Sequence, residues 1–247
     1  MKLSSDVNTI FAYGNSNDLF HNKVWLFMAK NKRNDYVLLA RVKHVFIYTY
    51  KDYLTTCCAI IEIAIREEKT KRSKSPSETY KPSTLALSAN IHQQIEKFIK
   101  EKSEEITFNI GGVKNFINLL LTEYSIPELF ENNGVFGEFR EKYNVEAEKR
   151  AEEILNKFLH FFHSFYVMNI EQYDTYEEWI QKIKESKYKI FDNKKDYEDI
   201  LLAAEILSCN QDIGTMGFFT CDKEIHRSII VVAKEYQQKI GHVLLIN

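Results

Sequence analysis

The chain ends with the stretch GFFTCDKEIHRSIIVVAKEYQQKIGHVLLIN (217–247), which predicts a strand, a helix and a second strand. Gly217–Thr220 is a short apolar run typical of a buried strand, and Asp222 follows it almost at once. Two strands joined by one helix form a βαβ unit, which favours a parallel sheet. Ligands of open α/β sheets bind outside the carboxyl ends of the strands, so Asp222 is either a helix cap or one member of a site.

Further elements are expected along the rest of the chain. The segment MKLSSDVNTIFAY (1–13) predicts an N-terminal strand that runs into a loop, and KHVFIYTY (43–50) has the composition of a strand. Helices are predicted over 55–68, which starts with a threonine, over 145–168, which carries a wide apolar stripe, and over 196–209, which opens with acids. This pattern indicates an α/β fold with a parallel sheet.

The middle of the chain differs in character from its two ends. Residues 69–84, KTKRSKSPSETYKPST, are basic, rich in Ser and Pro and without periodicity, so they predict a mobile surface loop. From about 85 to 185 the pattern is helical, with turn signals in between. We therefore expect a core domain formed by residues 1–68 and 190–247. Residues 69–189 are expected to form a basic loop and a helical insertion subdomain.

Composition narrows the class of protein without identifying its chemistry. The 247 residues carry a net charge of −2, so no global positive field attracts nucleic acid, although a local patch can still bind it. The four cysteines have no CxxC spacing and no signal peptide precedes them, which favours a reduced cytoplasm. No stretch approaches the roughly 18 apolar residues that a membrane span needs, so we expect no membrane association.

Carboxylates stand at the edges of several apolar elements: Asp6, Glu62, Asp196, Asp199 and Asp222. Acids at helix starts usually cap the helix, but an unpaired acid within an apolar helix, as at Glu62, is costly. If these acids converge, two carboxylates about 4 Å apart repel by roughly 4 kcal/mol at an effective dielectric near 20, so the cluster needs a cation. Oxygen ligands select Mg²⁺ or Mn²⁺, ions that activate water and stabilise the charge on a phosphodiester during cleavage.

Four short segments, taken in order, resemble the motifs of PIN-domain proteins. Asp6-Val7-Asn8-Thr9 is similar to the family's opening D-T-N segment, and Thr56 with Glu62 is similar to the Ser/Thr-to-Glu spacing of its second motif. The acids of 196–199 before Ile200-Leu201-Leu202-Ala203-Ala204 resemble the third motif, and Thr220-Cys221-Asp222 resembles the fourth. The third motif aligns in two registers, so Asp196 and Asp199 both stay candidates. A weaker register of the first motif places Tyr13 where the aspartate belongs and implies a damaged site.

The resemblance implies a parallel-sheet α/β/α, PIN-like core of a nuclease that depends on Mg²⁺ or Mn²⁺ and acts mostly on RNA. Carried over, Asp6, Glu62, Asp199 and Asp222 would hold the metal, with Asp196 as a fifth acid or the true third one. Asn8 and Thr220 would orient the site. The basic residues Lys69, Lys71 and Arg72 are candidates for phosphate contacts with the RNA.

The resemblance covers about half of the chain, at its two ends, and leaves the insertion 69–189 unexplained. One alternative is a non-catalytic PIN-like module that binds RNA or a protein partner through this insertion. Another is a PIN-like nuclease that acts on DNA, because a metal-bound phosphate is the same in both nucleic acids. The Phe- and Tyr-rich insertion is also a candidate surface for a protein partner or a homodimer.

Overall fold

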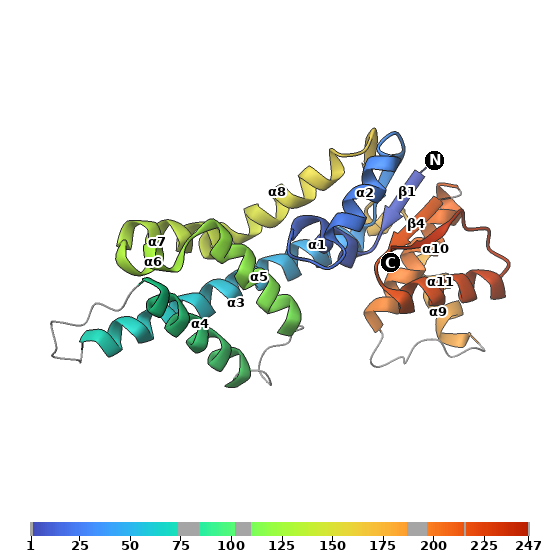
Figure 1. Cartoon of the computed structure of the whole chain (residues 1–247). Helices are drawn as coiled ribbons and strands as arrows, with labels where there is room; N and C mark the ends of the chain where they lie inside the picture. The colour runs from blue at the N-terminus through green and yellow to red at the C-terminus, as the bar shows by residue number, and fades with distance from the viewer. Residues whose placement is uncertain (1, 74–83, 102–109, 187–196, 215, 247) are drawn as a thin grey trace. The chain divides into compact units, whose positions relative to one another are not determined.

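The computed structural model describes residues 2–73, 84–101, 110–186, 197–214 and 216–246. The chain forms two compact units (Figure 1). Unit 1 comprises Met1–Ile47 and Glu153–Asn247, and unit 2 comprises Tyr48–Glu152. These bounds differ from the sequence-based division, because residues 48–68 belong to unit 2 and residues 153–189 belong to unit 1. Both units therefore include residues that the sequence had assigned to the other part.

Unit 1 is built on a five-stranded parallel sheet with the strand order β3-β2-β1-β4-β5. The strands are β1 (Lys2–Ser5), β2 (Asp35–Leu38), β3 (Ser164–Val167), β4 (Met216–Thr220) and β5 (Val243–Leu245). All five residues of β4 are buried, as a central parallel strand requires. The predicted parallel α/β sheet is confirmed. The chain leaves β1 toward β2 and later returns on the other side of β1 as β4, so the order reverses between these two strands.

Helices cover both faces of the sheet. In Figure 1, α1 (Val7–Gly14) and α2 (His21–Asn31) lie on one side of β1 and β4, and α9 (Tyr176–Glu185), α10 (Tyr197–Asp212) and α11 (Lys223–Glu235) lie on the other. This distribution follows from right-handed crossovers that run in opposite directions from β1. A 3₁₀ turn, η2 (Ile170–Gln172), precedes α9. The predicted helix 196–209 and the strand, helix and strand of 217–247 are confirmed, whereas the loop predicted after Asp6 is the helix α1.

One long helix, α3 (Ala40–Ser73), spans three segments that the sequence analysis had predicted separately as a strand, a helix and the start of a loop. Residues 43–50 are helical rather than a strand, Thr55 lies inside the helix rather than at its start, and residues 69–73 of the predicted basic loop are its last residues. The remainder of that loop up to residue 83 lies outside the described residues. The buried side chains recur every three or four residues, which is the helical period, and this pattern outweighs the strand-like composition: Val42, Phe46, Tyr50, Leu54, Cys57, Ile61 and Ala64.

The helix predicted over 145–168 ends early. Helix α8 spans Ala147–Leu159, and after a turn over residues 160–163 the chain forms β3. Tyr36 of β2 stacks on Phe162 with ring centroids 4.8 Å apart, which places the chain after α8 against the sheet. The apolar stripe still explains the buried side chains of Ala147, Ala151, Phe158 and Phe162, but Phe165 is 37% exposed on a strand.

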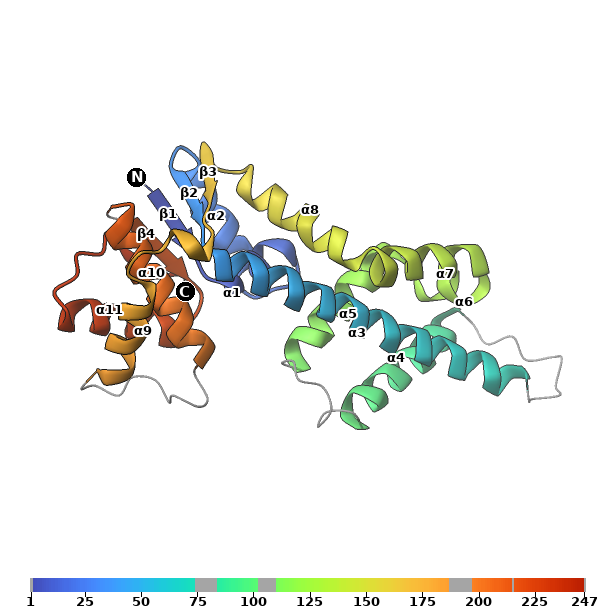
Figure 2. The ribbon, with the colours of Figure 1, turned by 180° about the vertical axis from the view of Figure 1, so that it is seen from behind.

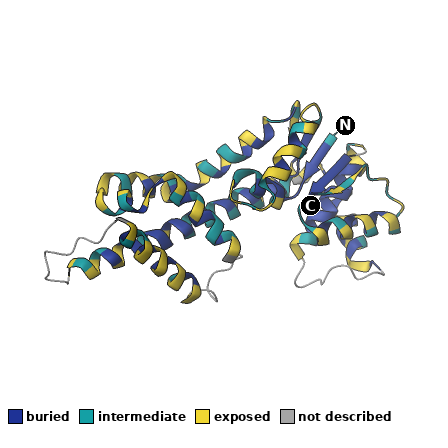
Figure 3. Ribbon diagram, in the orientation of Figure 1, coloured by how far each residue is buried: buried dark blue, intermediate teal, exposed yellow. Residues whose placement is uncertain are grey.

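Unit 2 is helical throughout its described part. It contains most of α3, then α4 (Thr84–Glu101), α5 (Ile110–Glu123), α6 (Ile126–Glu131), α7 (Asn133–Arg140), the π-helical turn η1 (Glu141–Val145) and the start of α8. Figure 3 shows its helices with buried inner faces and exposed outer faces. Aromatic contacts form much of the core, with Phe116 against Tyr50 and Phe139 against Tyr124. A helical subdomain in the middle of the chain is thus present, with the bounds of unit 2.

Candidate functional site

Asp6 lies at the carboxyl end of β1 and is 1% exposed. It is the N-cap of α1, and its Oδ1 accepts hydrogen bonds from the Thr9 amide at 2.9 Å and from the Thr9 hydroxyl at 2.6 Å. A side-chain acceptor at this position satisfies one of the free amides of the first helical turn. The carboxylate is therefore held in one orientation at the edge of the sheet.

Thr220 links Asp6 to Asp222. In the register of β1 with β4, Ser5 lies opposite Phe219, so the next residues of both strands, Asp6 and Thr220, are neighbours. The Thr220 hydroxyl donates to Asp6 Oδ2 at 2.5 Å and accepts a hydrogen bond from the Asp222 amide at 2.8 Å. Asp222 in turn caps α11, because its Oδ1 accepts hydrogen bonds from the amides of Glu224 and Ile225. Thr220 thus links the carboxylate of Asp6 to the backbone of Asp222 at the point where the strand order reverses.

Burial and mutual repulsion perturb the ionisation of this edge of the sheet. Burial is the main reason that the pKa of Asp6 is raised, the hydroxyls of Thr220 and Thr9 oppose it, and the nearby charge of Asp222 adds to it. Burial, together with the charges of Asp6, Asp18 and Asp222, raises the pKa of the Cys221 thiol to about 12, although the hydrogen bond from Thr9 opposes this rise. The carboxylates of Asp6, Asp18 and Asp222 thus all disfavour the Cys221 thiolate.

Asp18 is a residue that the sequence analysis missed. It is half-buried after α1, and its Oδ1 accepts a hydrogen bond from the Phe20 amide. The segment Asn15-Ser16-Asn17-Asp18 contains typical turn residues, and this signal could have placed the acid in a turn beside the carboxyl edge of the sheet. Its nearness to Cys221 depends on the fold and is not visible in the sequence.

Glu62 has partners of its own. It lies on α3 in unit 2, where it forms ion pairs with Arg66 and, at 3.0 Å, with Arg140 Nε. Its side chain is only 13% exposed, so the sequence-based expectation that this acid needs a partner is met by two arginines. The charge that was assigned to a metal ion is thus already balanced within unit 2.

The acids at the start of α10 are only partly described. Asp196 lies outside the described residues, and Asp199 is a half-buried residue of the first turn of α10. Between them, Glu198 forms an ion pair with Arg41 Nη1. The role of Asp196 or Asp199 as the third acid stays a prediction.

Glu205 is a second acid that the sequence analysis missed. It is fully buried, and its carboxylate accepts hydrogen bonds from the Arg41 amide at 3.0 and 3.2 Å, next to the first residue of α3. Burial raises its pKa, and the hydrogen bond from the Arg41 amide opposes that rise. The sequence does show a charged residue inside the apolar run of α10, and this pattern could have indicated a buried acid with a specific partner. Its role here is to join α10 to the start of α3.

The remaining predicted residues lie apart from this edge. Asn8 is an exposed residue of α1, and it is the neighbouring Thr9 that contacts Asp6. Tyr13 packs its ring edge-on against Phe158, with centroids 5.3 Å apart. Asp6, rather than Tyr13, therefore stands directly after β1.

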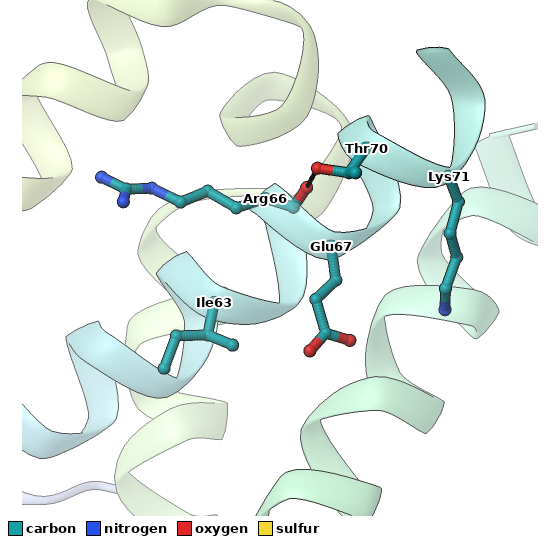
Figure 4. A pocket seen from close by; sticks show the side chains of 5 residues that line it. All are labelled: Ile63, Arg66, Glu67, Thr70 and Lys71. Carbon is teal, nitrogen blue, oxygen red and sulfur yellow. Dashed lines mark hydrogen bonds between the residues drawn. The ribbon is translucent and has the colours of Figure 1, made fainter. Parts of the chain in front are cut away.

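The three basic candidates lie at the end of α3 in unit 2. Lys69 donates to Asn133 and lies over the ring of Phe130, and Arg72 pairs with Glu68. Lys71 lines an open hollow of about 380 Å³, shown in Figure 4, together with Ile63, Arg66, Glu67 and Thr70. All five residues belong to one face of α3, so this hollow is the surface of a solvated helix with both signs of charge.

Within the described ranges, the structure contains no group of three or more His, Cys, Asp or Glu side chains arranged to hold a metal ion. None of the described helices combines the length and the apolar character that a membrane crossing needs. No family model, curated protein or solved structure matches the chain.

Proposed function

We propose that this protein is a divalent-metal-dependent nuclease that hydrolyses RNA phosphodiester bonds at the carboxyl edge of β1 and β4. The observation that carries the proposal is the linkage of Asp6 and Asp222 through Thr220 at the point where the strand order reverses. Open parallel sheets bind their ligands at this point. The order of the four PIN-like motifs along the chain supports a nuclease, and that family's substrates are the reason for preferring RNA.

The donor chemistry of this edge fits Mg²⁺ or Mn²⁺. Asp6 and Asp222 offer carboxylate oxygens, and Asp18 supplies a third negative charge nearby. In the described hydrogen bonds Asp222 uses only Oδ1, which leaves its Oδ2 for a cation. The raised pKa of Asp6 reflects burial and the charge of Asp222, and a dication would relieve both effects. Asp6 and Asp222 are thus the proposed ligands.

A bound dication in such a site lowers the pKa of water and neutralises charge on the phosphodiester. The chain's own residues contribute orientation. Thr9 and Thr220 fix the two oxygens of Asp6, and the cap of α11 fixes Asp222. The predicted contributions of Glu62 and Asp199 are not needed for this smaller site.

The proposal is tested by incubating labelled single-stranded RNA and DNA with the protein in Mn²⁺ and in EDTA. We expect RNA cleavage in Mn²⁺ only, and a loss of at least about 100-fold in Asp6→Asn and Asp222→Asn. Asparagine caps helices as well as aspartate does, so the second variant keeps its fold. Asp35→Asn is the matched control, because Asp35 begins β2 and so lies at the amino end of a strand of the same sheet, whereas Asp6 and Asp222 follow the carboxyl ends of their strands. Glu62→Gln should also keep full activity. Cleavage by Asp222→Asn at the parental rate would refute the assignment.

A non-catalytic binding module is the second candidate. Two observations favour it: the described residues contain no three-ligand metal group, and Glu62 is already neutralised by two arginines. Under this alternative, the protein binds RNA or a protein partner but leaves RNA intact in Mn²⁺. Binding of labelled RNA in EDTA, measured by fluorescence anisotropy, would then be the same for the parent protein and for Asp6→Asn.

A further inference from the structure

The outer side of α2 in unit 1 combines positive charge with exposed apolar side chains. Helix α1 packs against α2 (Figure 2), and the Trp25 ring contacts Phe161, in the turn after α8, with centroids 5.9 Å apart. Val24 and Met28 are fully buried, so they mark the inner side of the helix. The α2 face is defined by the charged and large apolar side chains that stay exposed on the helix or just after it: Lys23, Trp25, Leu26, Lys30, Lys32 and Arg33.

No acid balances these cations on the segments packed around them. From residue 19 to residue 34 the chain holds four cationic residues and no Asp or Glu. Helix α1 and the turn over residues 160–163 contain no acid either. The acids that flank this stretch are Asp18 and Asp35, and Asp35 Oδ1 accepts a hydrogen bond from the Ser164 hydroxyl at 2.6 Å. In the described part of the chain, no ion pair involves a cation of the α2 face. The face is therefore a positive patch on a chain whose net charge is −2.

Helix α2 leads away from the proposed site along the sheet. Asp18, whose charge acts on Cys221, comes shortly before the helix. After the helix the chain enters the amino end of β2, which is parallel to β1. The 11 residues of α2 span about 16 Å at 1.5 Å per residue, with Lys23 toward the site and Lys30 away from it. A polyanion with one phosphate at the site can thus follow the cations of α2.

We propose that the α2 face binds single-stranded RNA and holds it along α2, with the phosphate to be cleaved at the edge of β1 and β4. The choice of RNA rests on the proposed function. Proteins that bind single strands combine cations that contact the backbone with aromatic side chains on which bases stack, and Trp25 is 47% exposed among these cations.

The arrangement of the face favours RNA over a membrane surface. Leu26 follows Lys23 by three residues and precedes Lys30 by four, so the exposed apolar side chain lies between two cations on the same side of the helix. A helix that lies on a membrane needs a separate apolar face, and the inner apolar side of α2 is buried in unit 1.

Fluorescence anisotropy with a labelled single-stranded RNA of about 20 nucleotides, in EDTA, tests the charges. Lys30→Gln combined with Arg33→Gln should weaken binding at least tenfold. Each phosphate contact contributes about 0.7 to the slope of log affinity against log salt concentration, so this double variant should flatten the slope by about 1.4. The matched control is Lys71→Gln combined with Lys234→Gln, at exposed lysines of α3 and α11 in no described ion pair. It should keep both values.

Trp25 is tested separately, because stacking and charge change different quantities. Trp25→Leu should weaken binding about tenfold and leave the salt slope unchanged. Trp25→Phe keeps an aromatic ring for stacking and should stay within about threefold of the parent. Both variants keep an apolar side chain against Phe161, so unit 1 stays folded.

Equal effects of the two double variants would overturn the proposal, and so would unchanged binding by Trp25→Leu. It would also be overturned if the parent bound vesicles of phosphatidylcholine and phosphatidylserine but not RNA, because the face would then be a membrane surface. Binding in EDTA is independent of cleavage. RNA that binds through the α2 face but stays intact in Mn²⁺ would therefore refute the proposed nuclease and leave this RNA-binding surface in place.

Discussion

Replacing Thr220 by valine tests the linkage between the two strands. Valine has nearly the same shape as threonine but lacks the hydroxyl that donates to Asp6 Oδ2 and accepts from the Asp222 amide. Thr220 is fully buried, so water does not replace the lost partner. The change therefore leaves two polar groups of the site with one hydrogen bond fewer each.

The expected loss of unfolding free energy in Thr220→Val follows from these two hydrogen bonds. A hydrogen bond to a charged group contributes about 1.5–3 kcal/mol, and a buried polar group left without its partner costs about 1–3 kcal/mol. We expect Thr220→Val to lower the free energy of unfolding by about 3 kcal/mol. Thr220→Ser keeps the hydroxyl and loses one methyl group, which costs about 1 kcal/mol.

Urea unfolding followed by tryptophan fluorescence measures this difference. Both tryptophans of the chain, Trp25 and Trp179, lie in unit 1, so their emission reports on the unit that contains Thr220. With an m value of about 2 kcal/mol per molar, the midpoint of Thr220→Val should fall by about 1.5 M and that of Thr220→Ser by about 0.5 M. Equal midpoints for the two variants would show that the hydroxyl does not link the strands.

The other two predictions concern the buried acids. Because the pKa of Asp6 is raised on folding, chiefly by burial, the folded state holds this proton more tightly than the unfolded state does. Its contribution is present below the unfolded pKa of about 4 and is lost as the pH rises through the folded pKa, so Asp6→Asn should gain stability relative to the parent between pH 4 and pH 7 in urea titrations. Glu205→Ala should cost about 3 kcal/mol in the same fluorescence assay, since it leaves the Arg41 amide unpaired, while Glu205→Gln keeps an acceptor and should lose less than half as much. If the difference in stability between Asp6→Asn and the parent does not change with pH, the first expectation is wrong. If Glu205→Ala and Glu205→Gln lose equal stability, the second expectation is wrong.

The sequence predicted those helices and strands whose ends are marked by a polar or capping residue next to an apolar run. Strand β4, helix α11 and strand β5 were found because apolar runs alternate with a cap at Asp222, and β1 was found because Asp6 ends its apolar run. The part of α3 over residues 43–50 was missed, because Val, Ile, Tyr and Thr suggested a strand although side chains are buried there every three to four residues, as in a helix. The helix predicted over 55–68 is confirmed as part of α3. Strand β3 was missed because Phe158, Phe162 and Phe165 keep helical spacing across the end of α8.

The part of the candidate site that lies at the ends of strands could be predicted from the sequence. Asp6 and Asp222 follow parallel neighbouring strands, and their meeting follows from that topology. The partners of Glu62 were not predictable, because Arg140 comes from a helix far along the chain and reaches Glu62 only through the packing of unit 2. The same holds for Glu205, whose acceptor role depends on the start of α3 lying beside α10.

The central strand pair has a consequence for how the polypeptide acquires its structure. Asp6 and Thr220 are 214 residues apart, so β1 cannot pair with β4 until the segment between them has left the ribosome. Unit 2 is one continuous segment and its contacts are more local, which favours early and rapid folding. During synthesis, unit 2 can therefore fold while the side of β1 that later pairs with β4 is still unpaired.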